Sequence, residues 1–410
     1  MLARIFGFGT HRTSAVQWPE EPLDLPTSQF GGYYAAKPGL VFQSRYRVVN
    51  KLGWGQHSSV WLAEDQIRPE KPVAIKILSA HATEVQSQVA FELAILERIK
   101  DRKQTKNHLG RTHVLSLIDH FKENSPHGEH LCLVTEVLGS TLAQCQQLVH
   151  ESQFPIVVVK TITRQLLMAL DFLHSDCGIV HTDIKSDNIQ FVCRDVTAAV
   201  TLSEEACRPE VLSGFPIPTM LSRPLKAVTA DDLLDPVRVR DLQVKLTDFG
   251  TAAFIDGQHA ELIQPAALRA PEVILGCGWG PKADIWNLGC VVFELLTGTS
   301  LFRLKSGPSF SAEQYHLGHM PGFLGDDFAS HVDFLKKGKH FAHYFDDDGK
   351  CQLRCRVSGA LSLDQIFKEY GVLQGDAERA QCVDFLKSML RISPDERKTA
   401  KELLMHPWLA

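Results

Sequence analysis

Hydrophobic and polar residues alternate along the chain between Tyr46 and Ile77. Alternation with a period of two is typical of strands that bury one face. Two features divide the segment into short strands: a turn that contains glycines, and the polar run RPEKP. The positions predicted to be buried are Tyr46, Val48, Leu52, Val60, Leu62, Val73, Ile75 and Ile77. The pattern predicts an antiparallel sheet.

Helical spacing follows this segment. In TEVQSQVAFELAILERI, residues 83–99, apolar residues recur every three or four positions, which predicts an amphipathic helix. Its predicted inner face consists of Val85, Val89, Glu92, Leu93 and Leu96. Beyond about residue 140 helical periodicity dominates, as in VKTITRQLLMALDFLH and WNLGCVVFELLTG. We therefore expect an α+β chain, with a small strand-rich lobe and a larger helical lobe.

Two segments do not share these periods. Residues 1–40 are rich in proline, glycine and tyrosine, which predicts an extended arm laid against the folded chain. Residues 194–242 interrupt the helical region with prolines and glycines, and a long loop or insert of this kind is uncommon without a role. The predicted division is an arm at 1–40, a strand-rich lobe at 41–138, and a helical lobe at 139–410 that contains the insert.

Composition limits the classes of function. The chain has 410 residues, 44% of them hydrophobic, and a net charge of -5, which argues against direct binding to nucleic acid or anionic lipid. Polar residues interrupt every apolar run before it reaches the length of a membrane span. The ten cysteines occur singly, which favours a reducing compartment, cytoplasmic or nuclear. Arg4 and Arg12 near the start leave open either a targeting peptide or an unstructured tail.

The turn in LGWGQHSSV contains Gly53 and Gly55 between two predicted strands. Glycines at such a turn let backbone amides approach a phosphate group without an intervening side chain. The third glycine of a GxGxxG pattern is replaced by Ser58, so a simple hairpin that needs glycines is an equal alternative. A P-loop is excluded because no GK[ST] follows.

The strand VAIK ends at Lys76, and a lysine there could simply extend to the surface. Glu92, on the apolar face of the following predicted helix, needs a cationic partner to offset its burial. We therefore predict that Lys76 and Glu92 form an ion pair.

HTDIKSDN, residues 181–188, is followed by KLTDFG, which ends an apolar strand. Hard oxygen donors such as Asn188 and Asp248 suit Mg2+, which is held by few protein groups together with substrate phosphates. Asp183 is then left to accept a hydroxyl proton, and Lys185 to neutralise charge on a transferred phosphoryl group. Taken singly, these segments could equally be a solvated loop and a turn.

The motifs occur in the order of the protein-kinase signature set: glycine loop, VAIK, helix glutamate, HxDxKxxN, DFG, and APE at residues 270–272. The chain from about residue 40 resembles a eukaryotic protein kinase. GWGQHSSVWLAED, EVLGSTL, HTDIKSDN, LSRPL, EVILGCGWGPKADIW and HPWL resemble more narrowly the serine/arginine-protein kinases, especially their compact fungal members. That family shares HTD in place of HRD, serine at the third glycine position, and an insert before DFG.

The resemblance implies a bilobal fold: a small antiparallel-sheet lobe with one helix, and a larger, mainly helical lobe. It implies ATP bound between the lobes, Mg2+, and transfer of the γ-phosphate to serine in arginine/serine-rich proteins. The residues implied to cover ATP are Leu52, Gly53, Trp54, Gly55, Gln56, His57, Ser58, Ser59 and Val60. Ala74 would contact adenine, Lys76 the α- and β-phosphates, and Glu136 to Leu138 would form the hinge.

In the helical lobe, the resemblance implies that Asp183 is the catalytic base and that Asn188 and Asp248 are the metal ligands. The structural supports that it implies are Asp284 and an ion pair of Glu272 with Arg397.

The activation segment departs from many kinases. An arginine beside the catalytic aspartate often binds a phosphate on the activation loop, but Thr182 occupies that position. TAAFIDGQHAELIQPAALR offers only Thr251 as a hydroxyl. We therefore predict activity without phosphorylation of this loop.

Other departures concern specificity. IQPAALRAPE has proline and alanines where the family usually has a Thr-Arg-Gln-Tyr-like run, so substrate selection near Arg269 is expected to differ. Thr135 stands where the family commonly has phenylalanine, which predicts a deeper pocket behind adenine. The acidic clusters Asp326-Asp327 and Asp346 to Asp348 fit either arginine-rich substrates or solvated turns.

Two functions remain in competition. The first is an active, monomeric serine/threonine kinase that acts on arginine/serine-rich proteins. The second is a pseudokinase scaffold that binds nucleotide or partners without transfer. The motif residues favour the enzyme, because a scaffold needs none of these charges at these spacings. They are Lys76, Glu92, Asp183, Lys185, Asn188 and Asp248.

Overall fold

A computed structural model describes residues 19–346 and 361–410, except Ser87, Val89, Pro218, Gln258 and residues 194–195, 197–210 and 213–216. The chain forms two compact units. Unit 1 draws on residues 1–101, 115–140 and 190–228, and unit 2 on residues 102–114, 141–189 and 229–410. In the part of the chain that the structure describes, no helix combines the length and the apolar character needed to cross a membrane.

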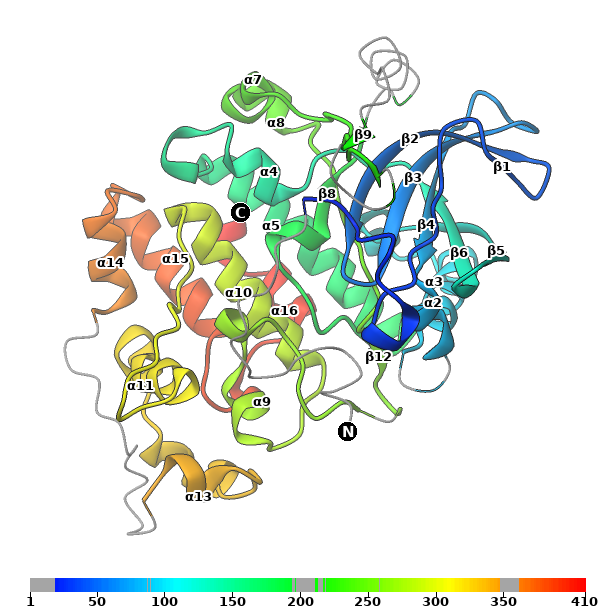
Figure 1. Ribbon diagram of the computed structural model, residues 1–410. Helices are drawn as coiled ribbons and strands as arrows, with labels where there is room; N and C mark the ends of the chain where they lie inside the picture. The colour runs from blue at the N-terminus through cyan, green and yellow to red at the C-terminus, as the bar shows by residue number, and fades with distance from the viewer. Residues whose placement is uncertain are drawn as a thin grey trace. The chain divides into compact units, whose positions relative to one another are not determined.

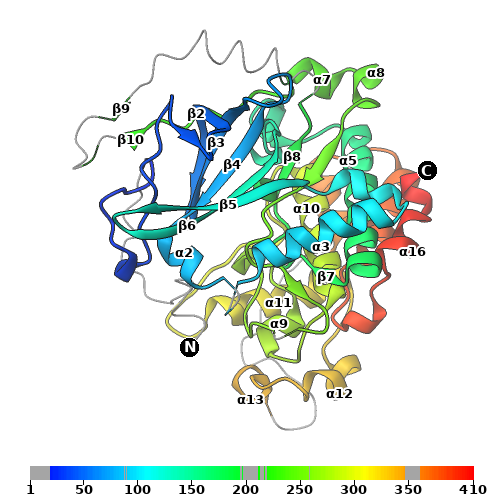
Figure 2. The ribbon, with the colours of Figure 1, turned by 90° about the vertical axis from the view of Figure 1, so that its right-hand side faces the viewer.

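An antiparallel sheet forms the centre of unit 1 (Figures 1 and 2). Its strands, in spatial order, are β1 (Val41–Phe42), β2 (Tyr46–Gly55), β3 (Ser58–Asp65), β4 (Val73–Leu78), β6 (Gly128–Glu136) and β5 (Leu117–Ser125). Each neighbouring pair is antiparallel. The strands predicted from alternation are confirmed, and one face of them buries Tyr46, Val48, Trp61, Val73, Ile75 and Ile77 in a common cluster.

The arm supplies part of that cluster. Ala36 is buried in it, and Tyr34 and Leu40 pack against it from the same segment. Leu23 and Tyr33 are also buried. Residues 19–40 thus cover apolar surface of the sheet that would otherwise face water.

The helix predicted at residues 83–99 is wrong at its start. The structure has a short α2 (Ala80–Glu84) and a separate α3 (Glu92–Thr105). Ser79 caps α2 by accepting a hydrogen bond from the Ala82 amide, and turn bonds to the Val85 carbonyl interrupt the ladder before α3 begins. The apolar spacing continues across this break, so periodicity alone could not reveal it. Val89 lies outside the described residues.

The predicted insert, residues 194–242, is divided between the units. Residues 190–228 group with unit 1, although the predicted boundaries assign them to the second lobe. There β9 (Val211–Leu212) and β10 (Thr219–Met220) pair antiparallel. The rest of the insert forms two short helices of unit 2, α7 (Ala230–Leu234) and α8 (Pro236–Val239). The described part of the predicted loop or insert thus contains a short strand pair and two short helices.

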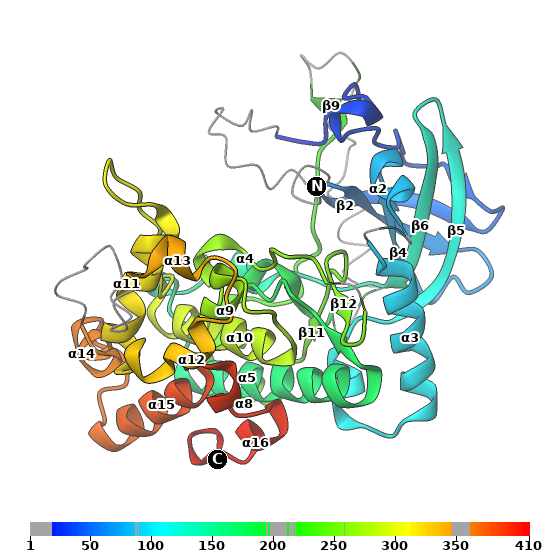
Figure 3. The same cartoon turned by 90° about the horizontal axis from the view of Figure 1, so that it is seen from below.

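Unit 2 is mainly helical (Figure 3). Its other helices are α4 (Leu142–Gln146), α5 (Ile156–Asp171), α9 (Pro271–Leu275), α10 (Pro281–Thr297), α11 (Ala312–Leu324), α12 (Val332–Leu335), α13 (Phe341–Tyr344), α14 (Leu363–Glu369), α15 (Asp376–Met389) and α16 (Ala400–Leu404). Four further short strands are β7 (Ile179–Val180), β8 (Ile189–Phe191), β11 (Val244–Leu246) and β12 (Ala253–Phe254). The buried α10 packs against α5 and α15. The predicted two-part α+β fold is confirmed.

A buried ion pair ties α9 to the segment before α16. The guanidinium of Arg397 donates to both carboxylate oxygens of Glu272, at 2.6 and 2.7 Å, and the two side chains are 0% and 1% exposed. Arg397 also lies over the Trp286 ring, 4.9 Å from its centroid. The pair implied by the family resemblance is therefore present, and it fixes the segment that follows the activation loop.

Candidate active site

The glycine-rich turn of unit 1 is a tight hairpin between β2 and β3. Gly55 pairs with Ser58, so Gln56 and His57 form the turn. A Cβ atom added at Gly53 or Gly55 would meet no atom within 4 Å. Packing therefore does not require glycine at these positions, which favours the interpretation that they leave room for a ligand.

The arm holds this turn from outside the motif. The Tyr33 hydroxyl lies 2.7 Å from the Gln56 carbonyl and 3.1 Å from the Gly55 carbonyl, and it donates to this pair. The Tyr33 ring meets the Trp54 ring edge to face, with centroids 6.3 Å apart. Burial raises the pKa of the Tyr33 hydroxyl, so it remains a donor at neutral pH. Sequence reasoning missed this contact, since Tyr33 is 22 residues from Gly55.

A second arm contact fixes β2 directly before the turn. Lys51 is fully buried and forms ion pairs with Glu20, at 2.5 Å, and with Glu21. It also donates to the Met220 carbonyl, and the Ser222 hydroxyl donates to Glu20 at 2.7 Å. Burial raises the pKa of Glu21, although Lys51 opposes the shift. This cluster joins arm, sheet and insert.

Sequence reasoning missed this cluster too. The features available were an acidic pair flanked by prolines in the arm, PEEP, and a lysine within a predicted strand, on the face opposite to Tyr46, Val48 and Leu52. Neither feature identifies its partner, because the two are 30 or more residues apart.

The predicted pair of Lys76 and Glu92 is present in unit 1. Lys76 Nζ donates to Glu92 Oε1 at 2.6 Å, and the Glu92 side chain is only 5% exposed. Glu92 is the first residue of α3, where the positive end of the helix dipole also favours its charge. The ion pair therefore fixes the position of the Lys76 ammonium group on β4.

The residues implied for adenine form an apolar cluster. Ala74 is buried with Leu62, Val137 and Leu225, and Leu52 and Val60 pack against them half-buried. In the hinge, the Glu136 carboxylate accepts the Ser116 amide at 2.9 Å. Thr135, at the position predicted to open a deeper pocket, is 7% exposed and donates to the Glu136 carbonyl.

In unit 2, Asp183 is the centre of the HTDIKSDN loop. Its Oδ2 accepts hydrogen bonds from Lys185 Nζ and from the Asn188 amide, both at 2.8 Å. The Asn188 amide also donates to the Asp183 carbonyl. Because these donors hold one carboxylate oxygen, the side chain has a fixed orientation, as a base must have to accept a hydroxyl proton.

Asp284 holds the backbone at the start of this loop. Its oxygens accept the His181 and Thr182 amides, each at 2.8 Å, and it is fully buried. Thr182 has φ 70, a left-handed conformation that costs a β-branched residue about 1–3 kcal/mol. The two bonds to Asp284 offset that strain, so Asp284 positions the loop as the family resemblance implies.

Thr182 also binds the activation segment. Its hydroxyl lies 2.9 Å from the Thr251 carbonyl, to which it donates, and 3.0 Å from the Thr251 hydroxyl. Thr182 is buried, so water competes little for these contacts. The position that carries a phosphate-binding arginine in many kinases here makes an uncharged bond to the residue that follows DFG.

The end of the activation segment is held by its own side chains. The Gln264 side chain accepts the Ala270 amide and donates to the Ala283 carbonyl, at 2.8 and 2.9 Å. Arg269 donates to the Ile263 and Gln264 carbonyls and is 8% exposed. Arg269 therefore has a structural role, and its guanidinium is not presented to a substrate.

Asn188 and Asp248 lie on adjoining backbone segments. The Thr247 amide donates to the Asn188 carbonyl at 2.9 Å, and Asp248 follows directly, exposed and at φ 60. Among the described residues the Asn188 amide oxygen has no hydrogen-bond donor. Mg2+ prefers oxygen ligands such as an amide oxygen and a carboxylate oxygen, so Asn188 and Asp248 fit a magnesium site.

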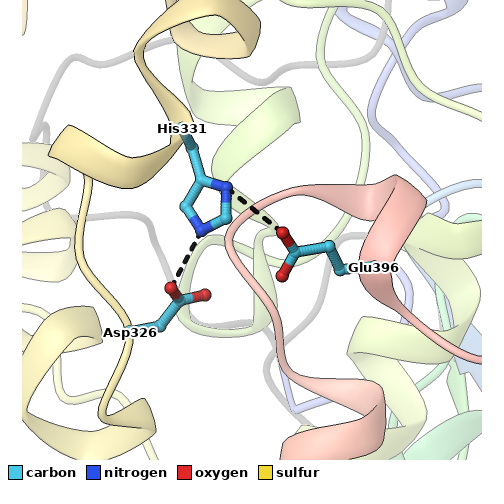
Figure 4. A group of neighbouring side chains, drawn as sticks. All are labelled: Asp326, His331 and Glu396. Carbon is cyan, nitrogen blue, oxygen red and sulfur yellow. Dashed lines mark hydrogen bonds and ion pairs between the residues drawn. The ribbon is translucent and has the colours of Figure 1, made fainter.

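Asp326 does not lie in a solvated turn, which was one of the two interpretations of the acidic pair Asp326-Asp327 (Figure 4). The Asp326 side chain is 7% exposed and binds His331 Nε2 at 2.8 Å, while Glu396 lies 3.6 Å from the other ring nitrogen. Asp327 remains exposed and accepts the Ser330 amide. Because the carboxylates flank opposite nitrogens of one ring, the group is a hydrogen-bonded cluster and does not converge on an ion. The other predicted cluster, beyond Asp346, lies outside the described residues.

Comparison with known proteins agrees with this arrangement. A model of the protein kinase domain matches residues 46–201 and 233–409. The serine/threonine-protein kinase SRPK of Physarum polycephalum is 32% identical over 402 residues, covering 93% of this chain and 89% of the relative. The chain belongs to the protein kinase family, among the SR protein kinases. It is therefore a protein serine/threonine kinase.

Other relatives of the kinase support the same assignment. Protein kinase dsk1 of Schizosaccharomyces pombe is 30% identical over 468 residues, with 93% of this chain and 83% of the relative covered. SRSF protein kinase 3 of Mus musculus is 26% identical, with 95% and 90% covered. A crystal structure of a kinase domain matches the fold with a TM-score of 0.67 and 23% identity, over 92% of this chain and 99% of that one.

Proposed function

We propose that this kinase transfers the γ-phosphate of ATP to serine in arginine/serine-rich proteins, with Mg2+, and needs no phosphate on its activation loop. The observation that carries the proposal is the bond from Thr182 to Thr251 beside an Asp183 whose Oδ2 is held by Lys185 and Asn188. The loop that bears the base is thus ordered by uncharged contacts. A phosphate has no cationic partner at the Thr182 position to bind.

In the proposed reaction, Asp183 accepts the proton of the substrate serine hydroxyl while the serine oxygen forms a bond to the γ-phosphorus. The bond from that phosphorus to the bridging oxygen breaks, and ADP leaves with the electron pair. Lys185 lies 2.8 Å from Asp183 and balances negative charge on the transferred group. Lys76, oriented by Glu92, holds the α- and β-phosphates.

Asn188 and Asp248 would hold Mg2+, which supplies positive charge to the phosphates when bound. Removal of the ion by a chelator is expected to abolish transfer, and addition of excess Mg2+ to restore it. Transfer that continues in the chelator would contradict the proposed ligands.

The substrate class rests on the relatives. The names of SRPK and of SRSF protein kinase 3 describe kinases of SR proteins, and they align over nearly the whole of this chain. The net charge of -5 is also of the sign that attracts arginine-rich substrates. We further propose that the enzyme acts as a monomer in the cytoplasm and nucleus, which light scattering and imaging of a tagged chain would test.

The alternative, a pseudokinase scaffold, predicts nucleotide binding without transfer. The paired Lys76 and Glu92 and the hydrogen-bonded Asp183 argue against it, since binding a partner requires neither arrangement.

The deciding experiment measures transfer from labelled ATP to an Arg-Ser repeat peptide, its Lys-Ser counterpart and a generic basic protein. Asp183→Ala serves as the inactive control. We expect transfer to favour the Arg-Ser peptide and to be lost in the variant. Equal labelling of all acceptors would reject the substrate class, and ATP binding without any labelling would establish the scaffold.

A further inference from the structure

One segment of the insert, residues 220–228, packs against parts of unit 1 that border the residues implied to bind ATP. The end of β10 lies beside β2 (Figure 2), where the Met220 carbonyl accepts Lys51 Nζ at 2.9 Å. The Arg223 amide donates to the Lys51 carbonyl at 2.8 Å. Lys51 directly precedes Leu52, the first residue of the glycine-rich segment implied to cover ATP. The insert segment therefore holds the strand that leads into the glycine turn.

The same segment reaches the residues implied for adenine and the chain after the hinge. Leu225 is 3% exposed and is buried in one cluster with Ala74 and Val137. A Cβ atom added at Gly139 would lie 2.0 Å from the Ala227 Cβ, so the two segments touch at this point. The segment thus supplies one apolar side chain to the cluster around Ala74.

Ser222 joins this segment to the arm. Its hydroxyl donates to Glu20 Oε2 at 2.7 Å, and its amide donates to Glu20 Oε1 at 2.5 Å. The Lys51 ammonium group binds the carboxylates of both Glu20 and Glu21, which are 3% and 1% exposed. One ammonium group therefore faces two buried carboxyl groups, and this cluster opposes any further negative charge.

The position of Ser222 also suits a phosphoryl acceptor. Ser222 is half-buried, and residues 221–229 form neither a helix nor a strand. Such a segment can enter a second active site without the loss of a helix or sheet ladder. Ser222-Arg223 is one of two Ser-Arg dipeptides in the chain. The other, Ser44-Arg45, has an exposed serine in the turn between β1 and β2 and offers a matched control.

We propose that Ser222 is a phosphorylation site at which one copy of the kinase modifies another, and that the phosphate weakens ATP binding. The inference rests on the proposed transfer to serine beside arginine. In this step Ser222 Oγ forms a bond to the γ-phosphorus of ATP, the bond from that phosphorus to the bridging oxygen breaks, and ADP leaves with the electron pair. The hydroxyl proton passes to Asp183 of the second copy and then to water.

The phosphate acts through the buried cluster. It carries a charge of about -1.5 to -2 and replaces the hydroxyl that donates to Glu20, so attraction becomes repulsion. Release of this contact frees the arm, whose Tyr33 holds the glycine turn, and the segment that carries Leu225. Phosphorylation is therefore expected to lower ATP affinity and to limit the activity of the kinase when its own concentration is high.

The first experiment tests the transfer. The parent enzyme, labelled ATP and Mg2+ are incubated with Asp183→Ala as the acceptor, and the phosphate is mapped by mass spectrometry. The acceptor that also carries Ser222→Ala is the control. We expect label at Ser222 and its loss from the control. Label on the Arg-Ser peptide but not on Ser222 would overturn this inference alone, and label on neither would overturn the proposed function as well.

The second experiment tests the consequence. Full-length chains are produced with phosphoserine in place of Ser222 or, as the control, in place of Ser44. We expect the chain modified at 222 to bind ATP about tenfold more weakly or worse, with a smaller change in kcat at saturating ATP. Hydrogen exchange of residues 19–40 should be faster in it, and the control should behave like the parent. Unchanged ATP affinity, unchanged exchange of the arm, or equal changes in both chains would overturn the proposal.

Discussion

The glycine-rich turn and the HTDIKSDN loop carry the two best-known motifs of this kinase, but they are held in different ways. Asp284, Thr251 and Asn188 hold the second loop through hydrogen bonds to its backbone and side chains. The glycine turn is open around its glycines and is held from outside by Tyr33 and by the Lys51 cluster.

The difference separates two kinds of order. In the proposed reaction the HTDIKSDN loop must place one carboxylate accurately, and its residues form a closed network together with Asp284 and Thr251. The proposed role of the glycine turn requires room for a ligand, and the contacts that hold the turn come from residues of the arm and the insert. Variants on the two sides should therefore fail differently: the first in turnover, the second in stability and nucleotide affinity.

Asp183→Ala is expected to give the largest effect. Loss of a general base typically lowers turnover by about 100- to 10,000-fold, whereas ATP affinity should change little. Steady-state transfer and nucleotide titration measure the two quantities. Asp333→Ala, which removes an exposed acid from α12, is the control and should behave like the parent. Equal turnover in Asp183→Ala and the parent would remove Asp183 from its role.

Lys51→Met tests the other side of the comparison. It leaves Glu20 and Glu21 buried without their cation, which is expected to cost about 3–5 kcal/mol of unfolding free energy at neutral pH and to raise KM for ATP. Lys37→Met, at an exposed lysine of the arm, is the matched control. Denaturant unfolding and ATP titration would show both changes, and a variant as stable as the control would reject the anchoring role.

The same variant has a predicted pH dependence. Burial already raises the pKa of Glu21, and removal of Lys51 takes away the main opposing influence. A carboxyl whose pKa is higher in the folded than in the unfolded state favours folding below its unfolded pKa, and that contribution is lost as pH rises through the folded pKa. The stability deficit of Lys51→Met should therefore shrink as the pH is lowered toward the ordinary range of glutamate. A deficit that is independent of pH would contradict this assignment.

Thr182→Val is expected to have a smaller effect. Valine keeps the shape of the side chain and removes the hydroxyl that donates to Thr251, a loss of about 1 kcal/mol, or roughly fivefold in turnover if the bond orders the active loop. Thr161→Val removes a comparable hydroxyl bond from the exposed face of α5 and should leave turnover unchanged. Similar turnover in both variants would show that the bond does not order the segment.

Thr135→Phe is expected to change turnover least. Threonine at this position predicts space behind adenine, so enlarged ATP-competitive inhibitors should bind the parent, and phenylalanine should block them. Inhibition curves for one enlarged and one ordinary inhibitor measure the difference. Equal inhibition of parent and variant by the enlarged compound would place Thr135 away from the nucleotide.

Local motifs explain what the sequence could predict. Asp183, Lys185 and Asn188 lie within eight residues, so their spacing alone indicated their grouping, and the strand pattern located Lys76. The Lys76–Glu92 pair was predicted because an acid on an apolar face needs a cation, although the helix that carries Glu92 begins nine residues later than its periodicity indicated.

What the sequence could not predict depends on distant partners. Glu20 meets Ser222 across 202 residues, and neither residue has a local pattern that names the other. The burial of Asp326 was not predictable from the acidic pair, because only the fold brings the Ile392 amide to it across 66 residues. Charges that are buried by tertiary contacts look like surface charges in a sequence.

The most direct test of the account is the turnover of enzyme that carries no phosphate. The chain would be produced together with a phosphatase, its intact mass measured, and its initial rate on the Arg-Ser peptide recorded before and after prolonged incubation with Mg2+ and ATP. We predict full activity at the unmodified mass, with no further rise even if Thr251 becomes phosphorylated. An unmodified enzyme that is nearly inactive and gains its rate as phosphate appears on Thr251 would contradict the account.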